Sequence, residues 1–324
     1  MYHTVLCTKT TAMKFKTPHF VAITVGSLMA VAAFMFYNPK AKINADNRTD
    51  IVIKGSESEF NLIIFFSSTY KKLRPDINFD ITGGGSGKGI EALLKNETHI
   101  ANSSRSITDG EMEEAKKSNL DIASYIIAGD AVAIITHRAV GVDSLSLDQL
   151  KSIFDGSVKN WKEVGGLDLP IVIFGRDNHS GTYHYLLNRF HLTNFPSGTS
   201  AFSYNYQVIN QVETQKGAIG YVSLGAITDL RGKPYHGVWT VSMYIEGGRA
   251  CSPFDIEAVK YGDYPLTRPL YQYVKKEANN TILDFIKFEL APEQQAALEK
   301  HGYFPITPIH QVINKKNSAL ALVH

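Results

Sequence analysis

The sequence predicts an α/β fold with largely parallel sheets, and two observations carry that prediction. Short apolar runs typical of strands alternate along the chain with amphipathic runs typical of helices. Each polar motif follows a strand-like run, and parallel sheets bind their ligands at the carboxyl ends of strands. The chain has 324 residues, enough for one large or two ordinary domains, and its 44% hydrophobic content argues against disorder.

The first predicted unit follows a polar linker that runs from Asn38 to Asp50. Pro75 ends its first helix, because proline cannot continue a helix. In chain order we expect a strand at Ile51–Ile53, a helix at Phe60–Leu73, a strand at Ile77–Ile81, a helix at Ile90–Lys95, a strand that leaves Ile100 for a polar loop ending at Ile107, and a charged helix at Asp109–Lys117.

A continuous apolar run at Ile126–Ile135 predicts a buried strand that crosses between two domains. A second α/β unit follows it, and the chain then returns through an apolar strand before its last helices. The second unit starts with the runs Leu147–Phe154 and Asn160-Trp161 and continues through a strand that begins at Ile171, a helix at Tyr183–Phe190 and the run Gly217–Val222. After it we expect a return strand at Tyr264–Val274 and helices at Asn280–Leu290 and Pro292–Lys300.

The N-terminal segment 1–45 is typical of an export signal. Its residues 20–37 are uncharged and mostly apolar, and Lys14 and Lys16 precede them. Cleavage after Ala45 would make the segment a signal peptide, and retention would make it a membrane anchor. In either case the lysines that precede the apolar run place the body of the protein outside the cytoplasm.

The charge of the body excludes one class of function. Residues 1–45 hold five lysines and no acid, so 28 Lys and Arg stand against 31 Asp and Glu in the rest of the chain. A mildly acidic body is a poor nucleic-acid binder, because such binding needs basic patches. Of the two cysteines, Cys7 lies in the N-terminal segment and Cys251 would be alone in the body, so we expect no internal disulfide.

A glycine-rich segment at 83–89 stands between a predicted strand and a predicted helix. This geometry exposes backbone N–H groups at a helix N-terminus, where they and the helix dipole attract an anion, and Ser86 adds a hydroxyl donor. The segment is not a P-loop, because Thr82 and Gly89 occupy the positions that need Gly and Ser or Thr. It is not G-x-G-x-x-G either, because Ile90 replaces the third glycine. An ordinary strand–helix turn is the alternative.

A second segment repeats this chemistry with a charged residue. The strand that begins near Ile171 delivers Arg176, whose planar guanidinium can bind an oxyanion through two N–H groups. Ser180, Gly181 and Thr182 then open a helix, and Asp177 could hold the guanidinium in place. The alternative is a surface arginine beside an ordinary helix cap. Residues 83–89 and 176–182 thus form two predicted anion-binding segments, the first and the second cradle. Two such segments in one chain indicate one anion held from two sides.

Two further polar motifs follow strands. Ser56 and Ser58 lie between the first strand and the first helix, and Ser103-Ser104-Arg105 follows a later strand. Each of these motifs also fits an ordinary cap or polar loop.

The sequence gives weak support for a metal site or for a catalytic nucleophile. The spacing of His179, His184 and His191 is five and seven residues, which is not that of a helical zinc pair. Ser180 with a neighbouring histidine could in principle form a nucleophile and base, but neighbours in sequence rarely meet in that geometry, and Ser86 lacks a Gly-x-Ser-x-Gly elbow. We therefore expect no metal, no cofactor and no enzymatic activity.

With these four segments in order, the chain resembles the periplasmic phosphate-binding proteins of ABC-type phosphate importers. The resemblance covers nearly all of residues 50–305. It rests on Gly55-Ser-Glu-Ser58, Gly83-Gly-Gly-Ser-Gly-Lys-Gly-Ile90, Ser103-Ser-Arg105, Arg176-Asp-Asn-His-Ser-Gly-Thr182 and the return strand Tyr264-Pro-Leu-Thr-Arg-Pro-Leu-Tyr271.

The resemblance implies a two-lobed periplasmic-binding-protein fold of type II. Each lobe would be a mostly parallel sheet flanked by helices, and two crossing strands would form the hinge. One lobe would span residues 48–130, with 266–324 returning to it, and the other would span 131–265. Phosphate would lie in the cleft between lobes that close on it.

The resemblance also implies the binding residues. One lobe would offer Ser58, the Phe60 N–H, Ser86 and Ser104, the other would offer Arg176, Ser180, Gly181 and Thr182, and Ser56 and Arg105 complete the set. Some members place an Asp where Ser104 stands, and that Asp accepts the proton of HPO₄²⁻ and so rejects sulfate. We hypothesise that Glu57, Glu59 or a serine supplies this acceptor here.

The resulting prediction is an exported, monomeric binding protein that captures inorganic phosphate and presents it to a membrane permease. Three alternatives remain open. The protein could bind another tetrahedral oxyanion, such as sulfate, molybdate or tungstate. It could be an exported phosphatase, or an anchored extracytoplasmic sensor or adhesive protein that has kept the fold.

Overall fold

The computed structural model describes residues 50–229 and 231–321. The predicted N-terminal signal or anchor, with Cys7, lies outside the described residues. Within the described ranges, no helix combines the length and the apolar character needed to cross a membrane. Cys251 is a buried free thiol. Residues 43–324 form a compact unit of their own.

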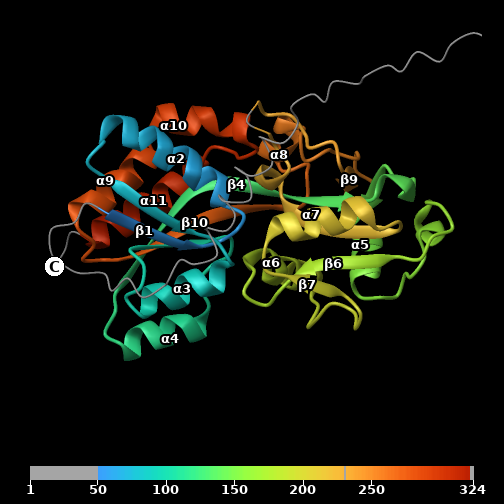
Figure 1. Cartoon of the computed structure of the whole chain (residues 1–324), viewed down its shortest axis with the longest axis horizontal. Coiled ribbons are helices and arrows are strands. Elements are labelled where there is room, and N and C mark those ends of the chain that lie inside the picture. The colour runs from blue at the N-terminus through green and yellow to red at the C-terminus, as the bar shows by residue number, and fades with distance from the viewer. Residues whose placement is uncertain (1–49, 230, 322–324) are drawn as a thin grey trace, which may run out of the picture. The chain divides into compact units, whose positions relative to one another are not determined.

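A sheet shared by two lobes organises this unit (Figure 1). The strand order is β2-β1-β3-β10-β4-β8-β6-β7, and β9 joins β4 to β5. Strand pairs that involve β4 or β10 are antiparallel, and the remaining pairs are parallel. The strands are β1 Asp50–Gly55, β2 Asn78–Thr82, β3 Ile100–Ser103, β4 Ile122–Thr136, β5 Ser144–Ser146, β6 Val172–Arg176, β7 Ser200–Phe202, β8 Ala218–Ser223, β9 Trp239–Tyr244 and β10 Thr267–Lys275.

Strand β4 is the predicted crossover, and at 15 residues it is long enough to serve both lobes. Its residues up to Ala131 pair with β10, and Val132–Thr136 pair with β8. Nearly all of its side chains are buried, which explains its continuous apolar sequence. The chain returns to the first lobe beside it, where the Val132 N–H donates to the Leu266 carbonyl at 2.8 Å. These two strands form the hinge.

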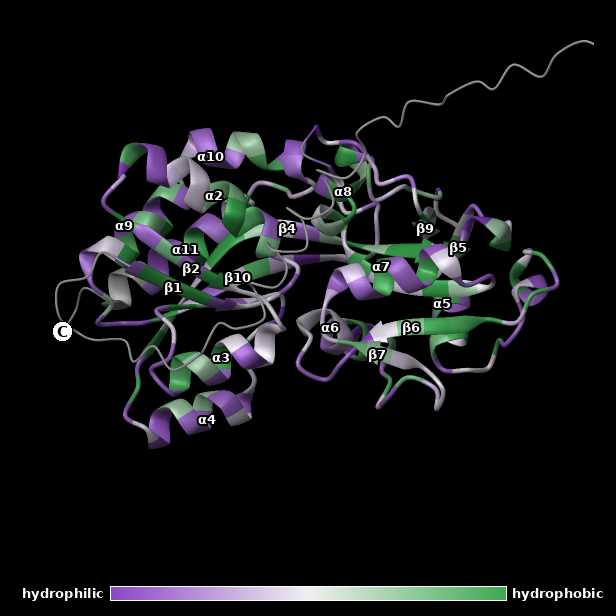
Figure 2. Cartoon of the chain, viewed as in Figure 1, coloured by the Kyte–Doolittle hydropathy of each residue, from purple (hydrophilic) through white to green (hydrophobic). Residues whose placement is uncertain are grey.

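The first lobe packs around two apolar clusters, a large one that includes Ile53, Phe66 and Phe285 and a smaller one that includes Ile90 and Tyr273. Figure 1 shows its helices gathered at one end of β4, and Figure 2 shows hydrophobic residues along β1. The helices are α2 Phe60–Leu73, α3 Ser86–Leu94, α4 Asp109–Lys117, α9 Asn280–Glu289, α10 Pro292–Ala297, η4 Leu298–His301 and α11 Pro308–Ala321.

The second lobe packs around a separate core that includes Ile134, Trp161, Tyr221 and Met243. Its helices flank β6, β8 and β4 at the other end of the hinge (Figure 1). They are η1 Arg138–Val140, α5 Leu147–Phe154, η2 Trp161–Val164, α6 Gly181–Phe190, α7 Asn205–Thr214, η3 Leu224–Ala226 and α8 Ile256–Tyr261.

The observed elements confirm most of the predicted ones, and two helices (α2 and α4) match residue for residue. The run Leu147–Phe154 that starts the second unit is helix α5. Helix α3 begins at Ser86, four residues before the predicted start, because the glycines of its first turn hide its helical character. Helix α6 likewise begins at Gly181 rather than Tyr183. Helices α7, α8 and α11 and strands β5, β7 and β9 were not predicted.

Candidate anion-binding site

Three loops of the first lobe leave the carboxyl ends of adjacent strands. Strand β1 lies between β2 and β3 and pairs with both in parallel, so the loops after these strands meet at one edge of the sheet. They carry four serines, Ser56, Ser58, Ser86 and Ser104, each at most 2% exposed. The first-lobe half of the candidate site is therefore a buried cluster of neutral hydroxyls.

Helix α3 approaches this edge very closely because of Gly89. A Cβ at this position would lie 2.5 Å from the Lys54 carbonyl oxygen of β1, a distance that no real side chain allows. The close packing brings Ser86 against the loop after β3. Its Oγ accepts from the Ser104 N–H at 3.1 Å and lies 3.4 Å from the Ser104 Oγ.

The second lobe contributes a fixed cation. Arg176 ends β6 with 1% of its surface exposed. Its guanidinium donates to the carbonyl oxygens of Phe202 (3.1 Å) and Ser203 (2.6 Å) and to the side-chain oxygen of Asn205 (2.5 Å). The Asp177 carboxylate accepts from the Ser203 hydroxyl (2.6 Å) rather than holding Arg176, as the sequence had suggested. Burial lowers the pKa of Arg176.

Helix α6 begins directly after this arginine. Its N-cap is Ser180, whose Oγ accepts from the Tyr183 N–H at 3.3 Å. Gly181 and Thr182 follow in the first turn, and all three residues are buried. The positive end of the α6 dipole and the N–H groups of its first turn therefore lie in the interior of the protein, where an anion would find them.

The two halves meet at Gly181 and Thr182. A Cβ on Gly181 would lie 2.4 Å from both the Ser86 and the Ser104 hydroxyl oxygens, so a larger residue would displace these two side chains. Nearby, the Ser58 Oγ lies 3.2 Å from the Thr182 Oγ1. The structure thus brings together predicted residues from sequence positions more than 120 apart.

Two predicted ligands have other partners in this structure. The Phe60 N–H donates to the Glu57 carbonyl at 3.4 Å, within the turn that begins α2. The Arg105 guanidinium forms a fork with the Glu111 carboxylate at 2.7 and 2.8 Å.

Sequence reasoning missed an ion pair that lies in the hinge itself. Arg268 of β10 donates through Nε (3.0 Å) and Nη2 (2.8 Å) to the Asp130 Oδ2 of β4. The same Nη2 lies 2.8 Å from the Ser58 Oγ and 2.9 Å from the Thr182 Oγ1, so it touches one predicted ligand from each lobe. One sequence signal was present, since Asp130 is a lone charge in an otherwise apolar run.

Two acidic residues were suggested as acceptors in place of the family's Asp. The Glu57 Oε1 already accepts from the Gly84 N–H at 2.9 Å. Burial raises the pKa of Glu57, although this hydrogen bond and the charge of Arg176 oppose the rise. Glu59 is fully buried, which raises its pKa well above its ordinary value, although the Ser56 hydroxyl and the charge of Arg268 oppose the rise.

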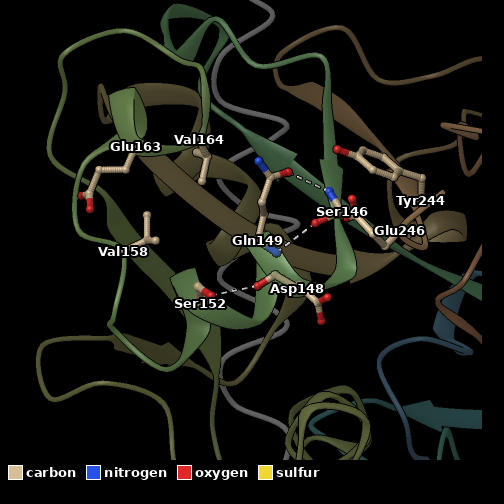
Figure 3. A pocket seen from close by; sticks show the side chains of 9 residues that line it. All are labelled: Ser146, Asp148, Gln149, Ser152, Val158, Glu163, Val164, Tyr244 and Glu246. Atoms are coloured by element: carbon tan, nitrogen blue, oxygen red, sulfur yellow. Dashed lines mark hydrogen bonds between the residues drawn. The ribbon is translucent and has the colours of Figure 1, made fainter. Parts of the chain in front are cut away.

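The pocket in Figure 3 is separate from the cluster of buried hydroxyls described above. It lies on the second lobe beside α5, and its lining residues are Ser146, Asp148, Gln149, Ser152, Val158, Glu163, Val164, Tyr244 and Glu246. The three carboxylates among them would repel an anion. Among the described residues, no group of three or more His, Cys, Asp or Glu side chains is placed to hold a metal ion.

Two α/β lobes joined by crossing strands, with hydroxyls and a cation converging between them, define an extracytoplasmic-type solute-binding protein. Comparison with known proteins agrees with this class. Residues 40–293 match the family described as the PBP superfamily domain. The chain therefore belongs to the PBP superfamily, with the type II fold.

Relatives within this superfamily are named phosphate-binding proteins. The Phosphate-binding protein PstS of Pseudomonas aeruginosa is 28% identical over 89% of this chain and 92% of its own length. The Bacillus subtilis PstS is 27% identical over 79% of this chain and 81% of its own length. A putative phosphate ABC transporter substrate-binding protein from Clostridium perfringens, solved with bound phosphate, is 26% identical and superposes with a TM-score of 0.70, covering 80% of this chain and all of its own.

Proposed function

We propose that this protein captures inorganic phosphate between its lobes and delivers it to the membrane permease of an ABC-type importer. One observation carries the proposal: hydroxyls of the first lobe meet the start of α6, which belongs to the second lobe, at a single buried point. That set of donors suits a tetrahedral oxyanion. The names of the relatives, which match most of this chain, point to phosphate.

The proposed ligands act by donating N–H and O–H groups to the anion. Arg176 has five N–H donors and uses three of them on protein acceptors, which fixes its orientation and leaves two for an oxyanion. The full proposed set is Ser56, Ser58, Phe60, Ser86, Ser104, Arg105, Arg176, Ser180, Gly181 and Thr182. Phosphate would enter between lobes of residues 48–130 with 266–324, and 131–265, and the lobes would then close on it.

The rest of the proposal concerns location and partners. The segment 1–45 would export the protein or anchor it outside the cytoplasm. The protein would act there as a monomer, without catalysis, and its partners would be phosphate and the permease. A binding role needs no reaction step, and neutral dipoles with arginine charge are sufficient to hold a dianion without a metal.

Calorimetric titration tests the proposal. Residues 43–324 would be stripped of bound anion by partial unfolding and dialysis, and then titrated with phosphate. We expect tight one-to-one binding. An absence of phosphate binding would overturn the function and leave the fold standing.

A sulfate titration tests the competing oxyanions. Sulfate is the main rival because Ser104 stands where some family members carry an Asp. A carboxylate or hydroxyl acceptor that faces the anion would reject sulfate, which has no proton to donate, and would accept HPO₄²⁻. We expect sulfate to bind at least about 100-fold more weakly than phosphate. Equal affinities would rule out the proposed acceptor, and tighter binding of molybdate or tungstate would change the assigned ligand.

A further inference from the structure

Arg268 is a buried cation that belongs to neither predicted cradle. It lies on hinge strand β10 with 5% of its surface exposed, and the Tyr185 ring covers its guanidinium at 5.3 Å. Its Nη1 is buried and has no hydrogen-bond partner among the residues that the structure describes. A buried N–H group without an acceptor is costly, so an absent acceptor is the simplest explanation of this atom.

The contacts of Arg268 also set the direction of two hydroxyl groups. Its Nη2 can only donate, and its two hydrogens are shared among three acceptors, the Asp130 Oδ2 and the Ser58 and Thr182 oxygens that lie 2.8 and 2.9 Å away. Each of those hydroxyls must then point its own hydrogen elsewhere, towards the other hydroxyl or towards a ligand. Arg268 therefore leaves at least one of these two hydroxyls as a donor to an oxyanion.

Asp130, the ion-pair partner of Arg268, does not use all of the N–H donors of the guanidinium. The Asp130 Oδ2 accepts from Arg268, and its Oδ1 accepts from the Ser223 hydroxyl at 2.6 Å. Both carboxyl oxygens thus have donors inside the protein, and Asp130 acts as a counter-ion rather than as an acceptor for the ligand. The guanidinium meanwhile keeps its Nη1 donors for a further acceptor.

We propose that Arg268 is a second arginine of the phosphate site. It contacts the bound anion through Nη1, and it orients the Ser58 and Thr182 hydroxyls when the two lobes are closed. This proposal rests on the proposed function and extends it, because it places a ligand on the hinge, where neither cradle reaches. Arg268 then contributes to affinity directly and also couples capture to closure, since its two hydroxyl partners come from opposite lobes.

Charge-neutral substitutions of the ion pair test this role. In residues 43–324, Arg268→Gln combined with Asp130→Asn removes both charges while keeping polar groups of similar size, so no buried charge is left unpaired. We expect the double variant to melt within a few degrees of wild type without ligand and to bind phosphate about 100-fold more weakly in calorimetric titration. Arg74→Gln with Asp76→Asn is the matched control, because it makes the same change in an exposed pair.

The single variant Asp130→Asn separates binding from scaffolding. It removes the counter-charge and keeps Arg268, so we expect phosphate affinity equal to or above that of wild type despite a lower melting temperature. If the pair served only the fold, Asp130→Asn would lose affinity together with stability. Such a parallel loss, or phosphate binding by the double variant within threefold of wild type, would overturn the proposal.

The phosphate titration of wild type distinguishes failure of the proposed function from failure of the role proposed for Arg268. If wild type binds phosphate and the double variant binds equally well, the assignment of Arg268 fails alone. If wild type binds no phosphate, the proposed function fails and the role of Arg268 falls with it.

Discussion

The two cradles of the site reach the same end by different means. The first lobe presents neutral hydroxyls, and backbone packing at Gly89 brings them into place. The second lobe presents a charged side chain, Arg176, which three protein acceptors hold in one orientation. The first cradle therefore depends on Gly89, which has no side chain. The second depends on the charged side chain of Arg176. The two should fail differently when mutated.

Removal of the cation should have the largest effect on binding. We expect Arg176→Ala to weaken phosphate binding about 100-fold or more, which corresponds to about 2.8 kcal/mol, because truncation of a buried charged partner usually costs about 2 to 5 kcal/mol. The melting temperature should also fall by several degrees, because the Phe202 and Ser203 carbonyl groups and the Asn205 side chain lose their donor. Calorimetry and thermal melting measure both effects. Near-wild-type affinity would show that the second cradle does not hold the anion.

A methyl group at the contact between the lobes should have the next largest effect. In Gly181→Ala the new Cβ would overlap the Ser86 and Ser104 hydroxyls, so both hydroxyls must turn away from the start of α6 when the lobes close. We expect phosphate affinity to fall about 30-fold, by roughly 2 kcal/mol, with little change in the stability of the ligand-free protein. Gly110→Ala is the control, because a Cβ there meets nothing within 4 Å. Equal affinities in these two variants would contradict a closed site at Gly181.

A methyl group at Gly89 should lower the free energy of unfolding, and the loss of affinity should follow from that change. In Gly89→Ala the Cβ would lie 2.5 Å from a backbone oxygen of β1, which cannot move aside as a side chain can. We expect the free energy of unfolding in urea to fall by about 2 kcal/mol, and affinity to fall with it because Ser86 shifts. A variant as stable as wild type would show that the close packing of α3 is unimportant.

The smallest expected effect is a change in the free energy of unfolding with pH. It arises from two buried carboxyl groups of the first lobe. Glu59 and Glu289 of the first lobe are fully buried, and burial raises the pKa of each carboxyl well above its ordinary value of about 4.3. The folded state then holds protons that the unfolded state has released. Their stabilising contribution is complete below pH 4 and is lost as pH rises through the folded-state pKa values.

The measurement is urea unfolding between pH 5 and pH 9. We expect the free energy of unfolding of wild type to decline with pH more steeply than that of a Glu59→Gln, Glu289→Gln double variant, by about 1 kcal/mol or more over the range. Subtraction of the two curves removes the contribution of other titrating groups, such as His99. Parallel curves would show that the two carboxyls are not held protonated.

The sequence predicted the parts of the fold that have local signals. Helix α2 was predicted to the residue because Pro75 ends it. Helix α4 was predicted as a charged helix, and the structure adds the capping box at Thr108 that begins it. Helix α7 also carried a signal that went unused, since its buried residues Asn205, Val208, Ile209 and Val212 follow helical spacing. Helix α3 started earlier than predicted because intrinsic propensity is weak at Ser86–Gly89.

The candidate site was predictable only in part. The order of four motifs sufficed to choose the two cradles, because each motif has a local strand–turn–helix pattern. The hinge pair was not predictable, since Asp130 and Arg268 are 138 residues apart and become partners only when β4 and β10 pair. The fork between Arg105 and Glu111 likewise depends on how the loop after β3 folds. Local patterns thus predict candidate ligands that begin helices, whereas the contact between Asp130 and Arg268 depends on long-range strand pairing.

A crystal structure of residues 43–324, stripped of bound anion and then grown with phosphate, tests the central claim most directly. The account predicts one phosphate between the lobes, within hydrogen-bonding distance of the Ser86 and Ser104 hydroxyls, the start of α6 at Gly181, and Arg176. Phosphate bound at any other place, or a closed site that remains empty at saturating phosphate, would contradict it.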